Sequence, residues 1–378
     1  MYKYKQYLKI FIFSSTFIIL FNFIIWNMYT KKVFIQDKIV GDLARMSYQI
    51  NLIDERENIS FLSKKHINYN QWNGREIDII TLGDSFSNAG AGGINPYYQD
   101  YLSSILNFDV INIQATKYGF IETILGLKTS GILDRMNPKF IILQSVERSS
   151  ISRYSKSIDF NLDINYKYMD ELLKKEYKNT ISNPSFLTHL NLNALLYNLF
   201  YKYDDNAFYS KVYKAKLSKC FFNTRICDEL LFYYEDLKNI NHSNSDSIKK
   251  LNDNLNKLQL ILDENNIKLL FMPVVDKYNL YSEYLIENNY DKSNFFENLR
   301  LHEKKYYFID TKKILKMLLE KEEKDIYYAD DTHWSFLASQ QIILELNQNL
   351  FKKENIDNNL ENLRKQIEEY DLNKSILD

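Results

Sequence analysis

One short segment of the 378-residue chain places a serine directly after a strand-like apolar run. The segment Thr81-Leu-Gly-Asp-Ser-Phe-Ser-Asn-Ala-Gly90 follows the run at residues 77–82. A serine at the carboxyl end of a strand in an open α/β sheet lies where such sheets bind ligands. Gly83 permits a sharp backbone turn there, and the N–H of Ser85 would be free to bind an oxyanion. Ser85 is therefore a candidate nucleophile, with an ordinary turn as the simpler interpretation.

A second segment, Tyr327-Tyr-Ala-Asp-Asp-Thr-His-Trp-Ser335, contains the partners that a serine nucleophile needs. A base must take the proton of the hydroxyl, and a carboxylate must orient the base and stabilise its charged form. His333 is the candidate base, because the other histidines have no comparable neighbourhood. Asp331 is the preferred carboxylate, and Asp330 is the rival because it lies three residues before His333. In the competing interpretation, one aspartate caps the next helix and His333 packs in the core.

The elements around these motifs alternate between short apolar runs and amphipathic segments. Such alternation indicates βαβ units and a parallel sheet. It stops between residues 149 and 240, a Tyr-, Lys- and Asn-rich stretch that we interpret as an insertion over the sheet edge. The expected strands are residues 77–82, 108–113, 139–144, 267–273 and 305–309, and the expected helices are residues 96–106, 121–135, 245–265, 311–320 and 336–351, with a short helix after Lys277.

The two motifs together resemble a known family. Gly83-Asp-Ser-Phe86 after a first strand and Asp331-Thr-His-Trp334 near the end of the domain are similar to the SGNH/GDSL hydrolase superfamily. The second motif, with residues 144–148 and 272–277, more narrowly resembles the SGNH-like domains of alginate O-acetylation proteins. The resemblance implies a three-layer α/β/α fold, a Ser85–His333–Asp331 triad, and transfer or hydrolysis of acetyl esters on an extracytoplasmic polysaccharide.

Two features depart from the family pattern. In the alginate proteins the Asp-x-His motif precedes the serine, whereas here it follows, as in ordinary SGNH hydrolases. SGNH enzymes also use a Gly after the second strand and an Asn after the third as oxyanion donors. Gly119 can take the first role, but no Gly-x-Asn-Asp follows the third strand, where Gln144 and Arg148 are the available donors. Trp334 is the aromatic side chain that a motif places to stack on a sugar.

Other features of these segments have plainer interpretations. Glu147 and Arg148 could form an ion pair that braces the end of the sheet, and Lys277 could be an ordinary solvated lysine rather than a ligand for a carboxylate or a sugar hydroxyl. The sequence shows no phosphate loop, Rossmann glycine fingerprint or metal-ligand cluster. We therefore expect a site that needs no cofactor and no metal.

Residues 10–28 form an uncharged run of 19 residues near the amino terminus. As a helix this run is about 28 Å long, which is close to the hydrocarbon thickness of a bilayer. Aromatic side chains at both ends suit the membrane interfaces, and no small-x-small cleavage site follows. We expect an uncleaved transmembrane helix, with a buried core helix as the alternative. Lysines flank both ends, so the positive-inside rule gives almost no orientation.

Cys220 and Cys227 are the two cysteines of the chain, on either side of a possible turn at Asn223-Thr224 that could bring two short strands face to face. A local disulfide would fit an oxidising compartment, and two unpaired thiols are an equal alternative. Zinc binding is disfavoured because two thiols without a nearby histidine make an incomplete site. On this basis we favour a single-pass protein of the cell membrane with its catalytic domain outside the cytoplasm.

These observations divide the chain into an anchor (1–29), a stalk or linker (30–75), an SGNH-like catalytic domain (76–351, with the insertion at 149–240) and a charged tail or helix (352–378). Lys plus Arg is 48 and Asp plus Glu is 49, giving a net charge of -1, which argues against a nucleic-acid partner held by bulk charge. With 45% hydrophobic and 26% charged residues, the composition excludes disorder along most of the length.

Two functions are compatible with this sequence. The first is a membrane-anchored O-acetyltransferase or acetylesterase that acts on a surface or exported polysaccharide through an acetyl-serine intermediate. The resemblance implies a polysaccharide acceptor and a membrane-bound partner that exports the acetyl group. The second is a non-catalytic component that binds glycans or assembles a polysaccharide modification complex. The missing Asn motif favours the second, and the complete Ser85, His333 and Asp331 set favours the first.

Overall fold

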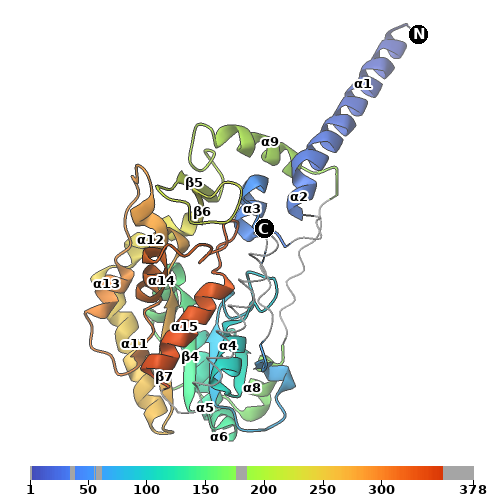
Figure 1. Ribbon diagram of the computed structural model, residues 1–378. Helices are drawn as coiled ribbons and strands as arrows, with labels where there is room; N and C mark the ends of the chain where they lie inside the picture. Colours follow the sequence, from blue (N-terminus) through green and yellow to red (C-terminus); the bar gives the residue numbers. More distant parts are fainter. Residues whose placement is uncertain (1, 35–38, 55, 57–61, 176–184, 352–378) are drawn as a thin grey trace.

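A parallel β-sheet forms the centre of the protein in the computed structural model, which describes residues 2–34, 39–54, 56, 62–175 and 185–351. Its strand order is β1-β3-β2-β4-β7-β8, and every neighbouring pair is parallel (Figure 1). The strands are β1 (Ile67–Asn68), β2 (Ile79–Gly83), β3 (Val110–Gln114), β4 (Phe140–Val146), β7 (Lys268–Val274) and β8 (Tyr307–Phe308).

The four long strands are apolar because both of their faces are covered. All of β2 is buried, and β3, β4 and β7 each leave only one terminal residue less than fully buried. Strands that are buried on both faces consist of continuous apolar runs, which is why these strands could be predicted from the sequence. Burial on both faces requires a layer of helices on each side of the sheet.

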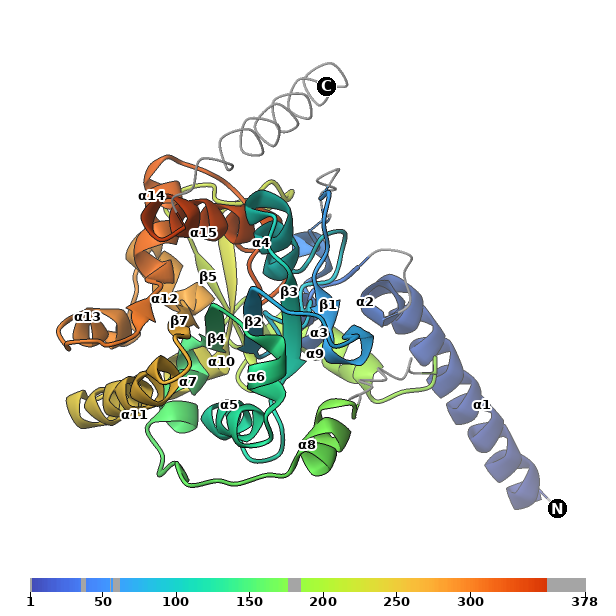
Figure 2. The same ribbon diagram turned by 90° about the horizontal axis from the view of Figure 1, so that it is seen from below.

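Helices cover both faces of the sheet and complete a three-layer α/β/α fold, as predicted (Figure 2). The expected helix over 121–135 is divided in two, because Gly131 adopts a left-handed conformation with φ 72°. One face is covered by α4 (Tyr98–Leu106), α14 (Thr311–Glu320) and α15 (Phe336–Asn349), and the other by α5 (Phe120–Thr129), α6 (Ile132–Met136), α7 (Glu147–Tyr154) and α11 (Ser245–Asp263).

The order of the strands determines where a ligand can approach. From β2 the chain passes to β3 on one side, and it then returns to β4 on the other side of β2. The carboxyl end of β2 therefore lies at a topological switch point, where open α/β sheets form their binding crevice. Ser85 follows β2 directly and lies at this point.

The predicted insertion contains its own small elements. An antiparallel pair is formed by β5 (Val212–Lys216) and β6 (Glu229–Tyr233), and the connection between them carries a disulfide between Cys220 and Cys227. The regular layer extends further than expected, since α7 packs against α11 although most of it lies beyond residue 149. The insertion also contains α8 (Tyr166–Leu173), α9 (Leu190–Phe200) and α10 (Tyr234–Lys238), whereas α12 (Lys277–Tyr281) and α13 (Phe295–Arg300) lie between β7 and β8.

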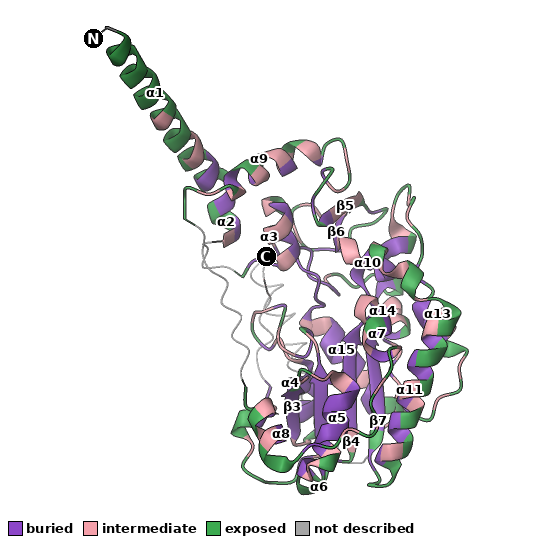
Figure 3. Cartoon of the chain, turned by 180° about the vertical axis from the view of Figure 1, so that it is seen from behind, coloured by how far each residue is buried: buried purple, intermediate pink, exposed green. Residues whose placement is uncertain are grey.

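The amino-terminal helix projects away from the domain (Figure 1). It comprises α1 (Tyr2–Ile25), a π-helical turn (Trp26–Thr30) and α2 (Lys31–Phe34). Most of α1 is exposed (Figure 3), and the span Lys3–Phe34 is long and apolar enough to cross a membrane. An exposed apolar surface of this size is costly in water, which makes this helix a candidate membrane span.

The described part of residues 30–75 differs from the expected stalk. Leu43, in α3 (Asp42–Ser47), and Leu52 are buried against Val212 and Leu231 of the β5–β6 pair, and β1 extends the central sheet. The contacts are long-range and join this segment to the insertion, so the local pattern of residues did not reveal them. The predicted carboxyl-terminal tail or helix, residues 352–378, lies outside the described residues.

Candidate active site

Ser85 is exposed in the turn that follows β2, and the residue before it anchors this turn. The Asp84 carboxylate accepts hydrogen bonds from Val146 N at 2.8 Å and from Gln144 Nε2 at 2.8 Å, and it pairs with Arg153. Burial by itself would raise the pKa of Asp84, but the Arg153 charge and these hydrogen bonds lower it below its usual value. Asp84 is therefore an ionised brace that ties the serine turn to β4.

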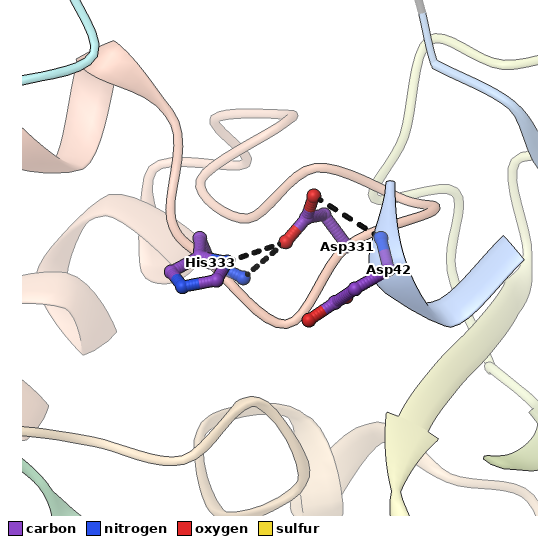
Figure 4. Close-up of side chains that lie close together, drawn as sticks. All are labelled: Asp42, Asp331 and His333. Carbon is purple, nitrogen blue, oxygen red and sulfur yellow. Dashed lines mark hydrogen bonds and ion pairs between the residues drawn. The ribbon is translucent and has the colours of Figure 1, made fainter. Parts of the chain in front are cut away.

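The structure brings Ser85, His333 and Asp331 into one hydrogen-bonded chain. His333 Nε2 lies 2.7 Å from Ser85 Oγ, and His333 Nδ1 lies 2.6 Å from Asp331 Oδ1. Figure 4 shows the Asp331 carboxylate pointing at the imidazole ring. The imidazole and the carboxylate are buried while the serine is exposed. This arrangement allows His333 to take a proton from a hydroxyl that remains accessible to a substrate.

Asp331, and not its neighbour, is the carboxylate at the histidine. Asp330 accepts a hydrogen bond from Gly41 N at 2.7 Å and one from Arg56 Nη1 at 2.6 Å. Neither aspartate caps the following helix, because the Ser335 side chain accepts the hydrogen bond from Leu337 N at the start of α15. The two aspartates are adjacent in the sequence, but their carboxylates have different hydrogen-bond partners.

The charges around His333 favour its protonated form. Burial by itself lowers the pKa of His333, but the Asp331 charge and hydrogen bond outweigh burial and raise the pKa above its ordinary value. Burial would likewise raise the pKa of Asp331, but His333 and Arg56 hold that pKa well below its usual range. Asp331 therefore remains ionised at neutral pH and can stabilise the imidazolium that forms when His333 accepts a proton.

Arg56 joins the two aspartates from the segment that was expected to be a stalk. Its guanidinium lies 2.6 Å from Asp330 Oδ1 and 3.0 Å from Asp331 Oδ2, and it stacks 4.0 Å from the centre of the Tyr328 ring. The side chains of Arg56, Asp330 and Asp331 are almost fully buried. Burial lowers the pKa of Arg56, but the two carboxylates raise it, so the guanidinium stays charged.

Asp42 and Asp54 also hold the aspartate loop from this segment. Asp42 accepts hydrogen bonds from Thr332 N at 2.8 Å and from Thr332 Oγ1 at 2.6 Å, and Asp54 accepts one from Ala329 N at 3.0 Å. Burial and the neighbouring Asp331 charge raise the pKa of Asp42 to about 6. Burial and the Asp325 charge raise the pKa of Asp54 to about 7. The segment therefore brings acidic groups close to an anionic loop at an electrostatic cost.

Lys277 is neither solvated nor a ligand for a substrate in this structure. It is buried, and its Nζ donates to the carbonyl oxygens of Tyr328 at 2.8 Å, Ala329 at 2.9 Å and Asp331 at 3.1 Å. Burial lowers its pKa to about 8. Lys277 thus fixes the backbone of the loop that presents Asp331 to His333.

The N–H of Ser85 has no hydrogen-bond partner among the described residues, so it remains a candidate oxyanion donor. The other predicted donors have different roles. Gly119 N donates to Thr116 O at 3.1 Å, and its φ of 126° is a conformation that favours glycine. A local turn therefore accounts for the glycine at position 119. The sequence alone could not distinguish this structural role from a role as an oxyanion donor.

The side chains of Gln144 and Arg148 are engaged by other partners. The buried Gln144 side chain braces the serine turn, accepting hydrogen bonds from Asp84 N and Ser87 Oγ. Arg148 pairs with Asp236 and Asp276 rather than with Glu147, which accepts hydrogen bonds from Asn279 and Ser293. The expected ion pair is thus replaced by a buried network in which Asp276 pairs with Arg148 and donates its N–H to Glu147 at 2.9 Å.

Trp334 is buried and packs against Phe86, with ring centres 5.0 Å apart at an angle of 77°. It does not offer an open face on which a sugar could stack. The ring centre of Phe86 also lies 4.6 Å from that of His333, so Phe86 packs against both the imidazole and Trp334. The expectation of a sugar-binding role for Trp334 is corrected to a packing role at the base of the site.

Asp42, Asp331 and His333 offer ligand atoms within 4.8 Å of one another, a grouping that the sequence did not reveal. Hydrogen bonds already engage these groups: Asp42 binds Thr332, and Asp331 binds both His333 and Arg56. A cation would have to displace the hydrogen bond that orients His333. The arrangement therefore fits a proton-transfer chain better than a metal centre.

A groove of about 860 Å³ lies beside the aspartate loop. Asp54, Arg56 and Tyr328 form part of its lining, together with Arg225 and Asp325. Its lining residues do not include Ser85 or His333. The groove therefore adjoins the carboxylate side of the hydrogen-bonded chain, and the structure gives no direct link from it to the reacting hydroxyl.

Sequence reasoning missed Arg56, Asp42 and the role of Lys277. No local motif marks the first two, since they lie more than 270 positions from their partners in the chain. Lys277 lies three residues after the end of β7, at the same sheet edge as Ser85, and this position was the available signal. Its burial and its three carbonyl partners depend on the tertiary structure.

The fold and this hydrogen-bonded chain define a class of protein, an α/β domain organised like a serine hydrolase. Residues 225–367 match the family model described as "SGNH hydrolase-like domain, acetyltransferase AlgX". This segment therefore resembles an AlgX-type SGNH hydrolase-like domain, and the predicted resemblance is confirmed. The matched residues include Asp331 and His333 but end short of Ser85 on the amino-terminal side. Searches of curated proteins and of solved structures gave no match.

Proposed function

We propose that this protein is a membrane-anchored, extracytoplasmic O-acetyltransferase that acts on a cell-surface or exported polysaccharide. The observation that carries the proposal is the Ser85–His333–Asp331 chain at the carboxyl end of β2. The AlgX-type domain supports acetyl transfer as its chemistry. Hydrolysis of the acetyl ester by water is the same reaction with a different acceptor.

The first half of the proposed reaction forms an acetyl-enzyme. His333 Nε2 takes the proton of Ser85 Oγ, and the oxygen attacks the acetyl carbonyl carbon of the donor. The Ser85 N–H donates to the oxyanion of the tetrahedral intermediate. The intermediate collapses as the bond to the donor oxygen breaks, and His333 gives its proton to that oxygen. Asp331 holds the imidazole and balances its transient positive charge.

The second half transfers the acetyl group. A sugar hydroxyl gives its proton to His333 Nε2 and attacks the carbonyl of acetyl-Ser85. The second tetrahedral intermediate releases Ser85, which regains its proton from His333. A membrane-bound partner that exports acetyl groups would supply the donor. No cofactor is needed by these steps.

Two features support the proposed location. The span Lys3–Phe34 is suited to cross a membrane, and a disulfide between Cys220 and Cys227 is typical of oxidising compartments. On this basis the domain would face the outside of the cell, where an exported polysaccharide is available. We propose the same four parts for the chain as in the sequence analysis, with residues 40–56 reassigned from the stalk to the support of the active site.

The test is to trap the acetyl-enzyme. The purified full chain is mixed with 4-nitrophenyl acetate and its intact mass is measured, with Ser85→Ala as the critical variant. Ser152→Ala is the matched control, because Ser152 is another exposed serine, in α7. We expect an acetyl adduct on the native protein and on Ser152→Ala, and none on Ser85→Ala. An adduct that survives Ser85→Ala, or folded native protein with neither adduct nor ester turnover, would contradict the proposal.

A non-catalytic glycan-binding or assembly role is the second candidate. It is favoured by one observation: the N–H groups of Gly119, Gln144 and Arg148 predicted as further oxyanion donors all have other partners or lie in other networks. A binding protein would retain its affinity for the glycan after Ser85→Ala and would form no adduct. Affinity measurements on that variant and the trapping experiment separate the two functions.

A further inference from the structure

One face of α9 is apolar and exposed. Leu192, Leu195 and Leu199 are spaced to share a helix face and are 51%, 36% and 46% exposed. The helix sequence, Leu-Asn-Leu-Asn-Ala-Leu-Leu-Tyr-Asn-Leu-Phe, contains no charged residue. Phe186 and Leu187, just before the helix, are also exposed. Leucines grouped in this way on a short uncharged helix are costly in water and indicate a surface that is covered in the working protein.

The opposite face of α9 packs on the end of the amino-terminal helix. Ala194, Tyr197 and Tyr201 are buried in a cluster that also contains Ile25 and Tyr48. Figure 1 shows α9 lying beside the domain-proximal end of α1 and α2. The exposed leucines are thus held by a packed interface, and this interface joins them to the helix that is proposed to cross the membrane.

The contact is polar at one point. Asn191 Nδ2 donates to Asn22 Oδ1 at 2.8 Å, which ties the first turn of α9 to α1. Asn22 lies six residues before Met28, inside an uncharged stretch that runs from Ile10 to Thr30. At 1.5 Å per residue this offset is about 9 Å along the helix axis. Amphipathic helices at a membrane surface bury their apolar face about 5 to 10 Å into the boundary between headgroups and acyl chains.

We propose that α9 is an interfacial membrane helix whose face at Leu192, Leu195 and Leu199 inserts into the lipid surface beside α1. A lipid surface is the occupant that the structure favours, because the face adjoins the membrane-spanning candidate at Asn22, within the apolar span, and has no charge to recognise a protein partner. The inference rests on the membrane anchoring in the proposed function, and it is independent of the acetyl-transfer chemistry.

This second contact would orient the active site. Val40 and Ala44 belong to the cluster beneath α9, and Gly41 and Asp42 of the same segment bond to Asp330 and Asp331. With α1 alone the domain could rotate about a single tether. With α9 also in the interface, the segment that supports the aspartate loop is held close to the membrane, on the side from which a membrane partner would deliver an acetyl group.

The test measures the environment of single positions in the full chain. The native cysteines form a disulfide, so an introduced cysteine can be labelled with an NBD fluorophore under non-reducing conditions. The labelled variants are Leu195→Cys and Leu199→Cys in α9, Phe17→Cys in α1, and Leu301→Cys as the matched control. Leu301 is an exposed leucine, 83% accessible, at the end of α13. Each variant is reconstituted into vesicles of phosphatidylcholine and phosphatidylglycerol, with or without nitroxide-labelled lipid.

We expect the labels at 195, 199 and 17 to emit at shorter wavelength and to lose most of their emission to the nitroxide lipid, and the label at 301 to do neither. If the labels at positions 195 and 199 behave like the label at 301 while the label at 17 is quenched, α1 is inserted and the α9 proposal is wrong. A protein partner would then be the occupant of the apolar face. If 17 is not quenched, the anchor and the α9 proposal both fail. Ester turnover of the same samples reports the catalytic proposal separately and confirms that each variant is folded.

Discussion

The two aspartates before His333 are adjacent in the chain but have different partners in the fold. Asp331 contacts the imidazole at 2.6 Å, whereas Asp330 binds Gly41 and Arg56. Only the first can fix the tautomer of His333 and stabilise the imidazolium. The assignment matters because a carboxylate acts on a neighbouring base through direct contact and charge, and both decrease with distance.

Replacing Asp331 by Asn should remove most of the activity while preserving the fold. An amide favours the wrong tautomer of the histidine, and such a change lowers kcat by about 10⁴-fold in a comparable triad. Asp330→Asn is the matched control, because it changes the neighbouring carboxylate in the same way without touching the imidazole. Turnover of 4-nitrophenyl acetate measures both. Equal losses of turnover in the two variants would show that Asp331 acts by holding the loop in place and not by its contact with His333.

The pH dependence of ester turnover should report the same contact. His333 must be neutral to accept a proton, and its pKa is raised by Asp331. Activity is therefore expected to rise with pH, with its midpoint above the ordinary histidine value of about 6.5. Asp331→Asn removes the charge that raises this pKa, so the midpoint of the residual activity should move to lower pH. A midpoint that stays in place would rule out the proposed coupling.

At the scale of elements, the region from Gly41 to Arg56 was expected to be part of a linker, but it supports the loop that carries Asp330 and Asp331. It binds the aspartate loop through Gly41, Asp42, Asp54 and Arg56, and Arg56 pairs with two buried carboxylates. Buried ion pairs are costly to break from one side, because the remaining charge loses its partner in a place that water does not reach.

Arg56→Met should therefore destabilise the domain by about 3 to 5 kcal/mol. Arg75→Met is the control, because Arg75 pairs with Asp109 at 3.4 Å on the surface, with side chains 47% and 35% exposed. Its loss should cost less than about 1 kcal/mol. Urea denaturation of the two variants gives the comparison. Similar small effects would mean that Arg56 contributes little to holding the loop.

The fourth prediction concerns the disulfide in the β5–β6 connection. The bridge closes a loop with a sequence separation of 7, and residues of this loop contact Asp325, just before the motif that carries His333. A bridge across a loop of this size stabilises a fold by about 2 to 3 kcal/mol through the entropy of the unfolded chain.

The double variant Cys220→Ser with Cys227→Ser should lose that stabilisation. Native protein treated with a reductant should show a similar fall in unfolding free energy, and the double variant should not respond to the reductant. Thermal or urea denaturation with and without reductant is the measurement. An equal response of both proteins would show that the thiols are not bridged in the folded protein.

At the scale of the whole molecule, three separate parts of the chain meet at one end of the sheet. Residues near the amino terminus support the aspartate loop, β2 presents Ser85, and the segment before α15 presents His333. The anchor candidate joins the domain on the same side as α3 and α9 (Figures 1 and 3). Under the proposed function, this arrangement would place the site on the side of the domain that faces a membrane-bound acetyl donor.

The sequence alone was sufficient to predict the alternating strands and helices and the three-layer fold, and it singled out Ser85, His333 and Asp331, which the fold brings into hydrogen-bond contact. These features are encoded locally, since continuous apolar runs mark strands buried on both faces and the reactive groups follow strand ends or precede a helix. The long amphipathic helix α11 was found within two residues of its observed limits, because five apolar positions recur on its buried face.

The roles of the remaining residues were decided by the tertiary structure. Arg56 and Asp42 reach the active site across more than 270 positions of sequence, and no local pattern can encode such a contact. Four predicted site residues are of types suited to oxyanion or sugar binding: Gly119, Gln144, Arg148 and Trp334. In the fold, each of them contacts other groups of the protein instead. Donor capacity is a property of the residue type. Whether a donor is free depends on the groups that the fold packs around it.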